Sequence, residues 1–394
     1  MRLSKLANTI IPSATMAATL KAQELIAKGH DIVLATVGEP LDPVPEKVKQ
    51  EAIRFLSSNN SKYGSAQGLL PFRKSIAQWM NQLYGQVWTE SQIVVSPGSK
   101  YSLHALMQII CDPGDEVIIP APYWVSYETL AVMAQAKPVI VNCPAEAKYK
   151  LTPELLRQNL NNKSRLLILN SPNNPTGAIY SKDELQALYK EIQKFPDLFV
   201  ICDDIYNQLI FSDTMKRAPS ILDVCSEEDR QRIVIVHGAS KSFAMTGWRV
   251  GWTCSSPEVA SKLNYFNSQT LTCIPDFVQK AAQVALESES QFVIDLKNAI
   301  HKKFQMAYQA LADEKLLHVY ASEGAFYLWM KFPSTKKSAV VADELLNQYG
   351  LSVVPGSSFG MEYHIRLSLT ISEDSLKKAI DRLKKYLSDQ NKLV

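Results

Sequence analysis

The sequence has few of the features that assign a chain to a specialised class. Its six cysteines are scattered along 394 residues without a CxxC pair, and several stand in apolar runs such as LFVICDD. This pattern is typical of buried, reduced thiols in a cytosolic protein. No apolar run is long enough to cross a bilayer. The first twenty residues lack acidic side chains, but Pro12 and polar residues interrupt any signal-peptide core. We therefore expect a cytoplasmic protein without membrane contact.

Strong charge and the common catalytic signatures are also missing. A formal net charge of +3, with no basic cluster interleaved with aromatics, argues against a nucleic-acid partner. There is no GxGxxG, no GxxxxGK(S/T) and no HExxH motif, and we expect no metal. One GxSxG occurs at 356–360, but a strand pattern follows it where a hydrolase needs a helix. The sequence therefore disfavours a hydrolase.

What the sequence does contain is a regular alternation of strand and helix patterns. Amphipathic helical stretches separate most of a series of short apolar runs: DIVLATV, QIVVSPG, DEVIIPA, KPVIVNC, SRLLILNS, LFVICDD and RIVIVHG. This alternation predicts an α/β fold with a largely parallel, buried sheet. After about residue 275, a long helical stretch over 277–313 precedes strands at GAFYLWMKF, LSVVPG and HIRLSLT and a final helix from Ser372. That part predicts a smaller α+β domain, joined to the first by a long helix.

Two of the predicted strands end in segments suited to binding a ligand. In VVSPGSKYS, Gly98 turns the chain and Ser99 begins a helix, whose free N–H groups can bind an anion. In NSPNNPTGAIY, Asn174 stands in a rigid turn at the carboxyl edge of the sheet, where α/β proteins bind ligands. Taken alone, the first segment is better explained as an ordinary capped strand-to-helix connection, whereas a tight turn and a ligand site explain the second equally well.

Two further strands end in charged side chains. LFVICDDIY runs from a buried strand into Asp203 and Asp204, and a buried carboxylate is costly unless it is paired. Asp204 can be the N-cap of a following helix, whereas Asp203 is harder to explain in that way. In HGASKSFAMTGWRVGW, Lys241 follows the strand RIVIVHG, and Arg249 comes eight residues later.

These four segments together match the requirements of pyridoxal 5′-phosphate. Its phosphate needs N–H donors, its aldehyde needs an amine, and its ring nitrogen needs an anion. A desolvated lysine such as Lys241 is a nucleophile. The planar guanidinium of Arg249 is suited to a phosphate. The sequence therefore predicts this cofactor.

The segment GASKSFAMTGWRVG resembles the lysine signature of the pyridoxal-phosphate aminotransferases of classes I and II, which have fold type I. The resemblance extends from PSATMAATLKAQELIAKG to IRLSLTISEDSLKKAI and is nearest to the bacterial aspartate aminotransferase subgroup Iβ. It implies a large domain over 46–280 with a mostly parallel seven-stranded sheet. It also implies a smaller α+β domain formed by 1–45 and 281–394.

The resemblance implies a role for each matching residue. Lys241 binds the cofactor covalently and moves the proton at the substrate Cα, Asp203 pairs with the ring nitrogen, and Tyr206 and Asn174 hold the ring hydroxyl. The phosphate and ring are held by Gly98, Ser99, Lys100, Trp124, Ser240 and Arg249. The substrate is bound by Arg366, through its α-carboxylate, and by Gly38, Trp124 and Asn174. Tyr63 in KYGSAQG matches a tyrosine that reaches the neighbouring subunit's phosphate, which implies a homodimer with shared active sites.

The same resemblance implies a ping-pong transfer between L-aspartate and 2-oxoglutarate. An aromatic, prephenate or alanine aminotransferase and a pyridoxal-phosphate lyase remain alternatives. A non-enzymatic regulator with an aminotransferase-like domain would need an added DNA-binding domain, for which we expect no room. The distal carboxylate of aspartate needs a partner, for which Lys100 and Gln108 are candidates only if their side chains face the pocket.

Three departures from the family pattern stand out. Gly38-Glu39-Pro40 continues as Leu41-Asp42-Pro43-Val44-Pro45, and this difference lies near the expected substrate entrance. His237 stands where asparagine is common, and Asp204 replaces the usual glutamate.

Overall fold

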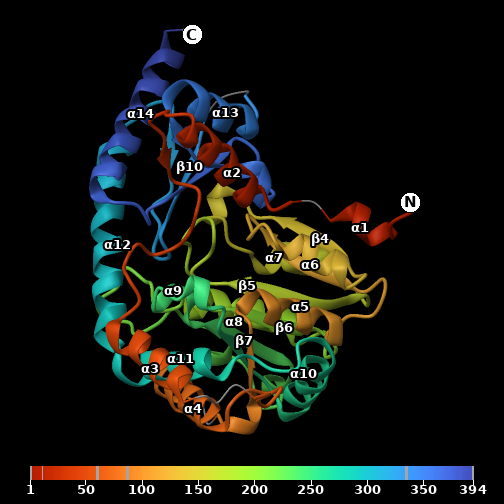
Figure 1. Ribbon diagram of the computed structural model, residues 1–394. Coiled ribbons are helices and arrows are strands. Elements are labelled where there is room, and N and C mark those ends of the chain that lie inside the picture. The colour runs from red at the N-terminus through yellow and green to blue at the C-terminus, as the bar shows by residue number, and fades with distance from the viewer. Residues whose placement is uncertain (1, 11, 59–61, 86–87, 333–335, 393–394) are drawn as a thin grey trace.

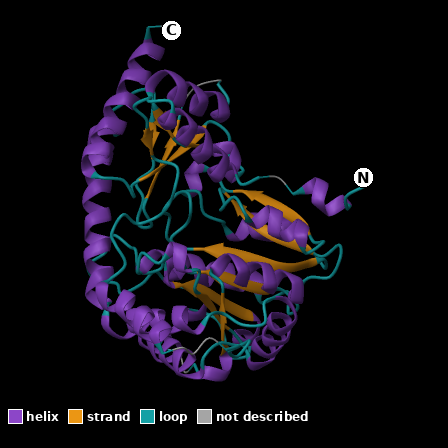
Figure 2. Cartoon of the chain, in the orientation of Figure 1, coloured by secondary structure: helices purple, strands orange, loops and turns teal. Residues whose placement is uncertain are grey.

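The structure is a computed structural model that describes residues 2–10, 12–58, 62–85, 88–332 and 336–392. Figures 1 and 2 show a larger part, built around a twisted sheet, and a smaller part that contains the C-terminal helix. The short helix α1 (Lys5–Thr9) extends away from both parts near the N-terminus (Figure 1). None of the described helices is both long and apolar enough to cross a membrane.

The larger part contains a seven-stranded sheet in the order β2-β8-β7-β6-β5-β3-β4. All neighbouring strands are parallel except β8, which runs antiparallel to both β2 and β7. This result confirms the predicted α/β fold with a mostly parallel sheet. The strands are β2 (Ile93–Ser96), β3 (Glu116–Ala121), β4 (Lys137–Asn142), β5 (Ser164–Asn170), β6 (Phe199–Asp203), β7 (Ile233–Gly238) and β8 (Gly251–Cys254).

Helices cover both faces of this sheet, because parallel strands need crossover connections that lie on its faces. One hydrophobic core joins the sheet to α3 (Glu46–Ser57), α4 (Leu70–Tyr84), α7 (Pro153–Asn159), α8 (Lys182–Ile192) and α11 (Asp276–Ser288). A second core joins the opposite face to α5 (Ser99–Ile110), α6 (Tyr127–Met133) and α10 (Pro257–Thr270). The apolar runs of the inner strands are buried from both sides as a result, whereas the edge strand β4 is mostly half-buried.

The smaller part is built on a four-stranded antiparallel sheet in the order β12-β13-β10-β9. Its helices include α2 (Ala14–Ala27), α13 (Ser338–Tyr349) and α14 (Glu373–Asn391), and Ser372 caps α14 as predicted. The run DIVLATV supplies β1 (Val33–Leu34), which pairs with β11 (Leu351–Ser352) outside the main sheet. The four strands are β9 (His318–Val319), β10 (Tyr327–Lys331), β12 (Val354–Pro355) and β13 (His364–Ser368).

A long helix connects the two parts, as the sequence predicts. The helical stretch over 277–313 is divided at Glu289 into α11 and α12 (Ser290–Leu311). In Figure 1, α12 runs along one edge of both parts. Its Val293 packs into the core of the larger part, while Leu296 and Ile300 pack into the core of the smaller part. The domain boundaries at residues 45 and 280 stay a prediction.

The GxSxG motif lies in a short 3₁₀ turn (Gly356–Phe359) between β12 and β13. The turn is followed by a strand. It therefore lacks the strand-to-helix geometry of a hydrolase nucleophile.

Candidate active site

A cavity of about 660 Å³ lies at the carboxyl ends of β5, β6 and β7, where the larger part meets the smaller one. Binding at the carboxyl ends of parallel strands is the general rule for open α/β sheets. Most of the predicted site residues line this cavity: Gly38, Ser99, Lys100, Trp124, Asn174, Asp203, Tyr206, Ser240, Lys241, Arg249 and Arg366. Of the two other predicted residues, Gly98 adjoins Arg249, and Tyr63 lies outside the cavity lining.

Lys241 lies on the single-turn helix α9 (Ala239–Ser242), which follows β7 directly. Its Nζ donates a hydrogen bond to the carbonyl oxygen of Gly38 at 2.7 Å. Burial lowers the pKa of Lys241 to about 8; Glu39 opposes this shift, and the positive charge of Arg366 adds to it. A lysine with a lowered pKa is neutral, and therefore nucleophilic, in a larger fraction of molecules at neutral pH.

Asp203 is the last residue of β6, and its two carboxylate oxygens differ in their hydrogen bonding. Oδ2 accepts a hydrogen bond from the Tyr127 hydroxyl at 2.6 Å. Oδ1 is buried and has no hydrogen-bond partner within the described part of the chain. Burial raises the pKa of Asp203 to about 6, although the Tyr127 hydroxyl and the Ile205 N–H lower it. An open, buried carboxylate oxygen at a cavity wall is suited to a cationic N–H donor.

An anion-binding corner forms where α5 begins. Gly98 has φ +87°, and a Cβ there would come within 2.3 Å of Arg249 Nη2, so the close approach of this guanidinium requires glycine. Arg249 donates to the carbonyl oxygens of Thr246 at 2.8 Å and Pro97 at 3.3 Å. Ser240 lines the same cavity. Helix N–H groups and a guanidinium together favour a phosphate-like anion.

A second cationic corner is contributed by the smaller part. Arg366 on β13 is only 2% exposed. Its Nη1 donates to Asn174 Oδ1 at 2.9 Å, and its Nη2 donates to the Thr36 carbonyl oxygen at 2.6 Å. The guanidinium lies 4.3 Å from the ring centre of Tyr327 and 4.9 Å from that of Phe359. Burial lowers the pKa of Arg366, but an arginine stays charged at any physiological pH.

The wall between these corners includes residues that the sequence did not reveal. Tyr127 is the first residue of α6 and follows Trp124 by three residues within the same PYWVSY segment, and its ring packs edge-on against that of Trp124 with ring centres 5.4 Å apart. The hydroxyls of Tyr206 and Tyr327 form a hydrogen bond with each other at 2.9 Å. A Cβ at Gly38 would come within 2.2 Å of the Tyr327 hydroxyl, so only glycine fits beside this pair.

Only one of the two candidates for the distal carboxylate faces the cavity. The Lys100 side chain lines it, with Nζ 5.0 Å from the ring centre of Trp124. Gln108 is absent from the lining, and its Nε2 donates to the Met133 carbonyl oxygen at 3.0 Å. The N-terminal residues Ser13 and Thr15, which no sequence pattern identified, also line the cavity.

The expected N-cap role of Asp204 is wrong. Residues 205–208 form a turn and begin no helix. Asp204 is only 4% exposed, and its Oδ2 accepts from the Tyr84 hydroxyl at 2.5 Å. Because successive strand side chains alternate, Asp204 points to the opposite face of the sheet from Asp203. Burial raises its pKa to about 7.

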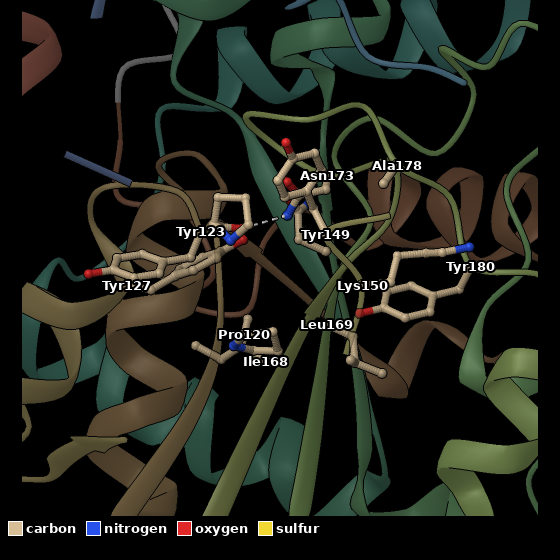
Figure 3. Close-up of a pocket in the computed structure, with 12 residues that line it drawn as sticks. Pro120, Tyr123, Tyr127, Tyr149, Lys150, Ile168, Leu169, Asn173, Ala178 and Tyr180 are labelled. Atoms are coloured by element: carbon tan, nitrogen blue, oxygen red, sulfur yellow. Dashed lines mark hydrogen bonds between the residues drawn. The ribbon is translucent and has the colours of Figure 1, made fainter. Parts of the chain in front are cut away.

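A smaller cavity of about 20 Å³ adjoins the larger one and has room for one water molecule. Figure 3 shows Tyr127 on one side of it and Lys150 with Tyr180 on the other. The Lys150 ammonium is paired with Glu184 at 2.5 Å and donates to the Ile179 carbonyl oxygen. Since this lysine is held as a paired cation, it is no rival to Lys241 as a nucleophile.

The chain is similar to known proteins over almost its whole length. A sequence profile of the family described as "Aminotransferase class I and II" matches residues 30–383. An aspartate aminotransferase of Bacillus subtilis (strain 168) is 34% identical over 396 residues, which cover 98% of this chain and 99% of the relative. An aspartate/prephenate aminotransferase of Nitrosomonas europaea is 32% identical over 400 residues, which cover 98% of this chain and 100% of the relative.

Solved structures give the same result. An aspartate aminotransferase of Thermus thermophilus with maleate superposes with a TM-score of 0.92 at 35% identity, covering 98% of this chain and 100% of the other. An aspartate aminotransferase of Rhizobium meliloti superposes with a TM-score of 0.93 at 28% identity, covering 98% of this chain and 99% of the other.

Proposed function

Because the chain belongs to the class I and II aminotransferase family, we propose that it uses pyridoxal 5′-phosphate to move an amino group between L-aspartate and 2-oxoglutarate. The observation that carries this proposal is the convergence of Lys241, Asp203 and Arg366 on one cavity. An amine, an open carboxylate oxygen and a buried guanidinium are the groups that such a transfer requires.

The described residues are suited to this cofactor. The unpartnered Oδ1 of Asp203 is an acceptor for the ring N–H, and the start of α5 with Arg249 is a corner for the phosphate. When bound, the cofactor supplies an electron sink that depends on a protonated ring nitrogen. Asp203 keeps that proton in place, and Tyr206 and Asn174 hold the ring hydroxyl. The Lys241 amine would hold the cofactor and would move the proton at the substrate Cα.

The substrate is held by its two carboxylates in this proposal. Arg366 binds the α-carboxylate through its planar fork, which Asn174 and the Thr36 carbonyl hold in place. Lys100, Ser13 and Thr15 line the same cavity and are the candidates for holding the distal carboxylate. The Thermus thermophilus relative was solved with maleate, itself a dicarboxylate, and this likeness supports a dicarboxylic substrate here.

The proposal includes a homodimer in the cytoplasm. Tyr63 is 88% exposed and lies outside the cavity of its own chain. This exposure supports a role for Tyr63 at the cofactor phosphate of a second copy. The six free thiols, four of them buried, support a reducing compartment. We also propose 46–280 as the large domain and 1–45 with 281–394 as the small domain.

A panel of amino donors and 2-oxo acids tests the reaction and its substrate separately. The purified protein should absorb visible light, and kcat/KM should be highest for aspartate with 2-oxoglutarate. Lys100→Met should lower kcat/KM for aspartate but not for alanine, whereas Gln108→Met is the matched control and should change neither. A markedly higher kcat/KM for prephenate or an aromatic 2-oxo acid would overturn the aspartate assignment alone. Elimination without amino transfer would overturn the aminotransferase in favour of a lyase.

A further inference from the structure

A chain of four buried polar side chains runs behind the carboxylate of Asp203, outside the cavity lining. It leads from His237, at the end of β7, through Asn207 and Tyr84 to Asp204. We call these four hydrogen-bonded side chains the relay. His237 and Asp204 are two of the positions at which the sequence departs from the family pattern. The structure shows that these two departures are the ends of one hydrogen-bonded chain.

The direction of each hydrogen bond in this relay follows from the available donors. The Gly238 N–H donates to His237 Nδ1 at 2.7 Å, so the imidazole proton is on Nε2. Nε2–H donates to Asn207 Oδ1 at 2.9 Å. Asn207 Nδ2 donates to the Tyr84 hydroxyl oxygen at 2.7 Å, and that hydroxyl donates to Asp204 Oδ2 at 2.5 Å. The relay therefore ends on Asp204, whose Oδ2 accepts the hydrogen bond from the Tyr84 hydroxyl.

Burial fixes the protonation of His237 and Tyr84, the two titratable side chains before Asp204. His237, Asn207 and Tyr84 are at most 5% exposed. Burial lowers the pKa of His237 to about 3, so the imidazole is neutral and has a single donor. Burial and the neighbouring Asp204 raise the pKa of Tyr84, which keeps its hydroxyl protonated. The imidazole also stacks on Trp252, with ring centres 5.3 Å apart, which fixes its orientation.

The relay lies against the backbone that carries Asp203. In the parallel ladder of β6 and β7, Asp203 pairs with Val236. The next residue, Asp204, donates its N–H to the Val236 carbonyl oxygen at 3.0 Å. Asp204 and His237 thus lie one step further on, on the face opposite to Asp203. Holding the Asp204 side chain therefore restricts the rotation of the strand end from which the Asp203 carboxylate projects.

We propose that the relay from His237 to Asp204 positions Asp203 for its contact with the ring nitrogen of the cofactor. His237, Asn207 and Tyr84 are positioning residues, because they act through Asp204 and touch neither cofactor nor substrate. By donating a hydrogen bond to Asp204 Oδ2, the relay holds that carboxylate away from the cavity. Asp203 Oδ1 is then the oxygen that contacts the ring. The inference rests on the proposed function.

The test compares two cofactors that differ only at the ring nitrogen. The full chain is titrated with pyridoxal phosphate and with its deaza analogue, in which carbon replaces that nitrogen. Both dissociation constants are measured by fluorescence. The dissociation constant of the deaza analogue divided by that of pyridoxal phosphate reports the Asp203 contact alone. Tyr84→Phe and His237→Leu should each reduce this ratio about threefold to tenfold, the effect of weakening one hydrogen bond. His237→Gln, which retains a donor toward Asn207, should restore most of it.

The matched control is Tyr180→Phe. Tyr180 is also buried, and its hydroxyl accepts from the Leu151 N–H at 2.8 Å, away from the relay. This variant should lose stability but keep the wild-type ratio. If the relay variants weaken both cofactors equally while Asp203→Ala abolishes the discrimination, the relay has a structural role only and the inference is wrong. If the wild-type chain does not discriminate between the cofactors, the ring contact of the proposed function itself is refuted.

Discussion

The two cationic corners of the cavity are built in opposite ways. Arg249 is an exposed residue held by the carbonyl oxygens of Thr246 and Pro97, beside the start of α5. Arg366 is 2% exposed and is fixed by Asn174, by Thr36 and by two aromatic rings. The first corner is assembled around neighbouring strand ends of one sheet. The second combines the smaller sheet with residues from the start and the middle of the chain.

This difference indicates how each corner binds its anion. A buried arginine with both Nη groups already oriented loses little conformational entropy when it binds a carboxylate. An exposed arginine is screened by solvent and ions, and the helix N–H groups share its task. We therefore expect substrate binding to depend strongly on one residue and phosphate binding to be distributed over several.

The largest effect should come from the residue between the two corners. Lys241→Ala should lower kcat by three orders of magnitude or more, because the amine that moves the Cα proton is lost. Single-turnover absorbance changes with aspartate measure this loss. Lys150→Ala is the control, since Lys150 is a buried lysine paired with Glu184 away from the chemistry. Near-normal turnover in Lys241→Ala would remove Lys241 from the mechanism.

The next largest effect should separate the two corners directly. Arg366→Gln should reduce kcat/KM for aspartate on the order of a hundredfold or more, because it removes a buried partner of a carboxylate. The affinity for pyridoxal phosphate, measured by titration, should change little. A loss of cofactor affinity as large as the loss in kcat/KM would show that the corners are not independent.

Arg249→Gln should have the converse and smaller effect. We expect roughly a tenfold rise in the dissociation constant of the cofactor, since the helix N–H groups remain. The effect should shrink at high ionic strength, because Arg249 is exposed. Equilibrium titrations at low and high salt measure both quantities. If Arg249→Gln raised the dissociation constant of the cofactor by as large a factor as Arg366→Gln lowers kcat/KM for aspartate, the distributed phosphate site would be contradicted.

The smallest effect concerns the pH dependence of cofactor attachment. The neutral amine is the nucleophile, and the pKa of Lys241 is lowered to about 8. The attachment rate should therefore rise with pH up to about 8 and level off above it, which stopped-flow absorbance can follow. Glu39 raises the pKa of this lysine, so Glu39→Gln should move the midpoint to lower pH. A midpoint that moves upward would mean that Glu39 does not act on Lys241 through its charge.

Most of the cavity side formed by the larger part could be predicted from the sequence because it follows strand ends. Asp203 ends β6, and Lys241 and Ser99 each follow the end of a strand by three residues. Parallel strands bring their carboxyl ends to one edge. The N-cap assigned to Asp204 failed for a local reason. An aspartate after a strand is equally compatible with a helix cap and with a turn that buries the side chain.

The second corner was accessible only through the family resemblance. The Arg366 guanidinium bonds to the carbonyl of Thr36, 330 residues away in sequence. No periodicity or spacing connects such positions. The same holds for the relay, whose members come from the end of α4, the turn after β6 and the end of β7.

The sequence by itself determined the alternation of strands and helices, the mostly parallel sheet and the chemical character of its strand ends, because these depend on local periodicity and residue type. Only the tertiary structure decided which oxygen of Asp203 stays open, that Lys100 rather than Gln108 faces the cavity, and that His237 and Asp204 are joined through Tyr84. The physical reason is that a side chain's partners are set by the packing of segments distant in sequence, and a buried polar atom must take whichever partners that packing brings within reach.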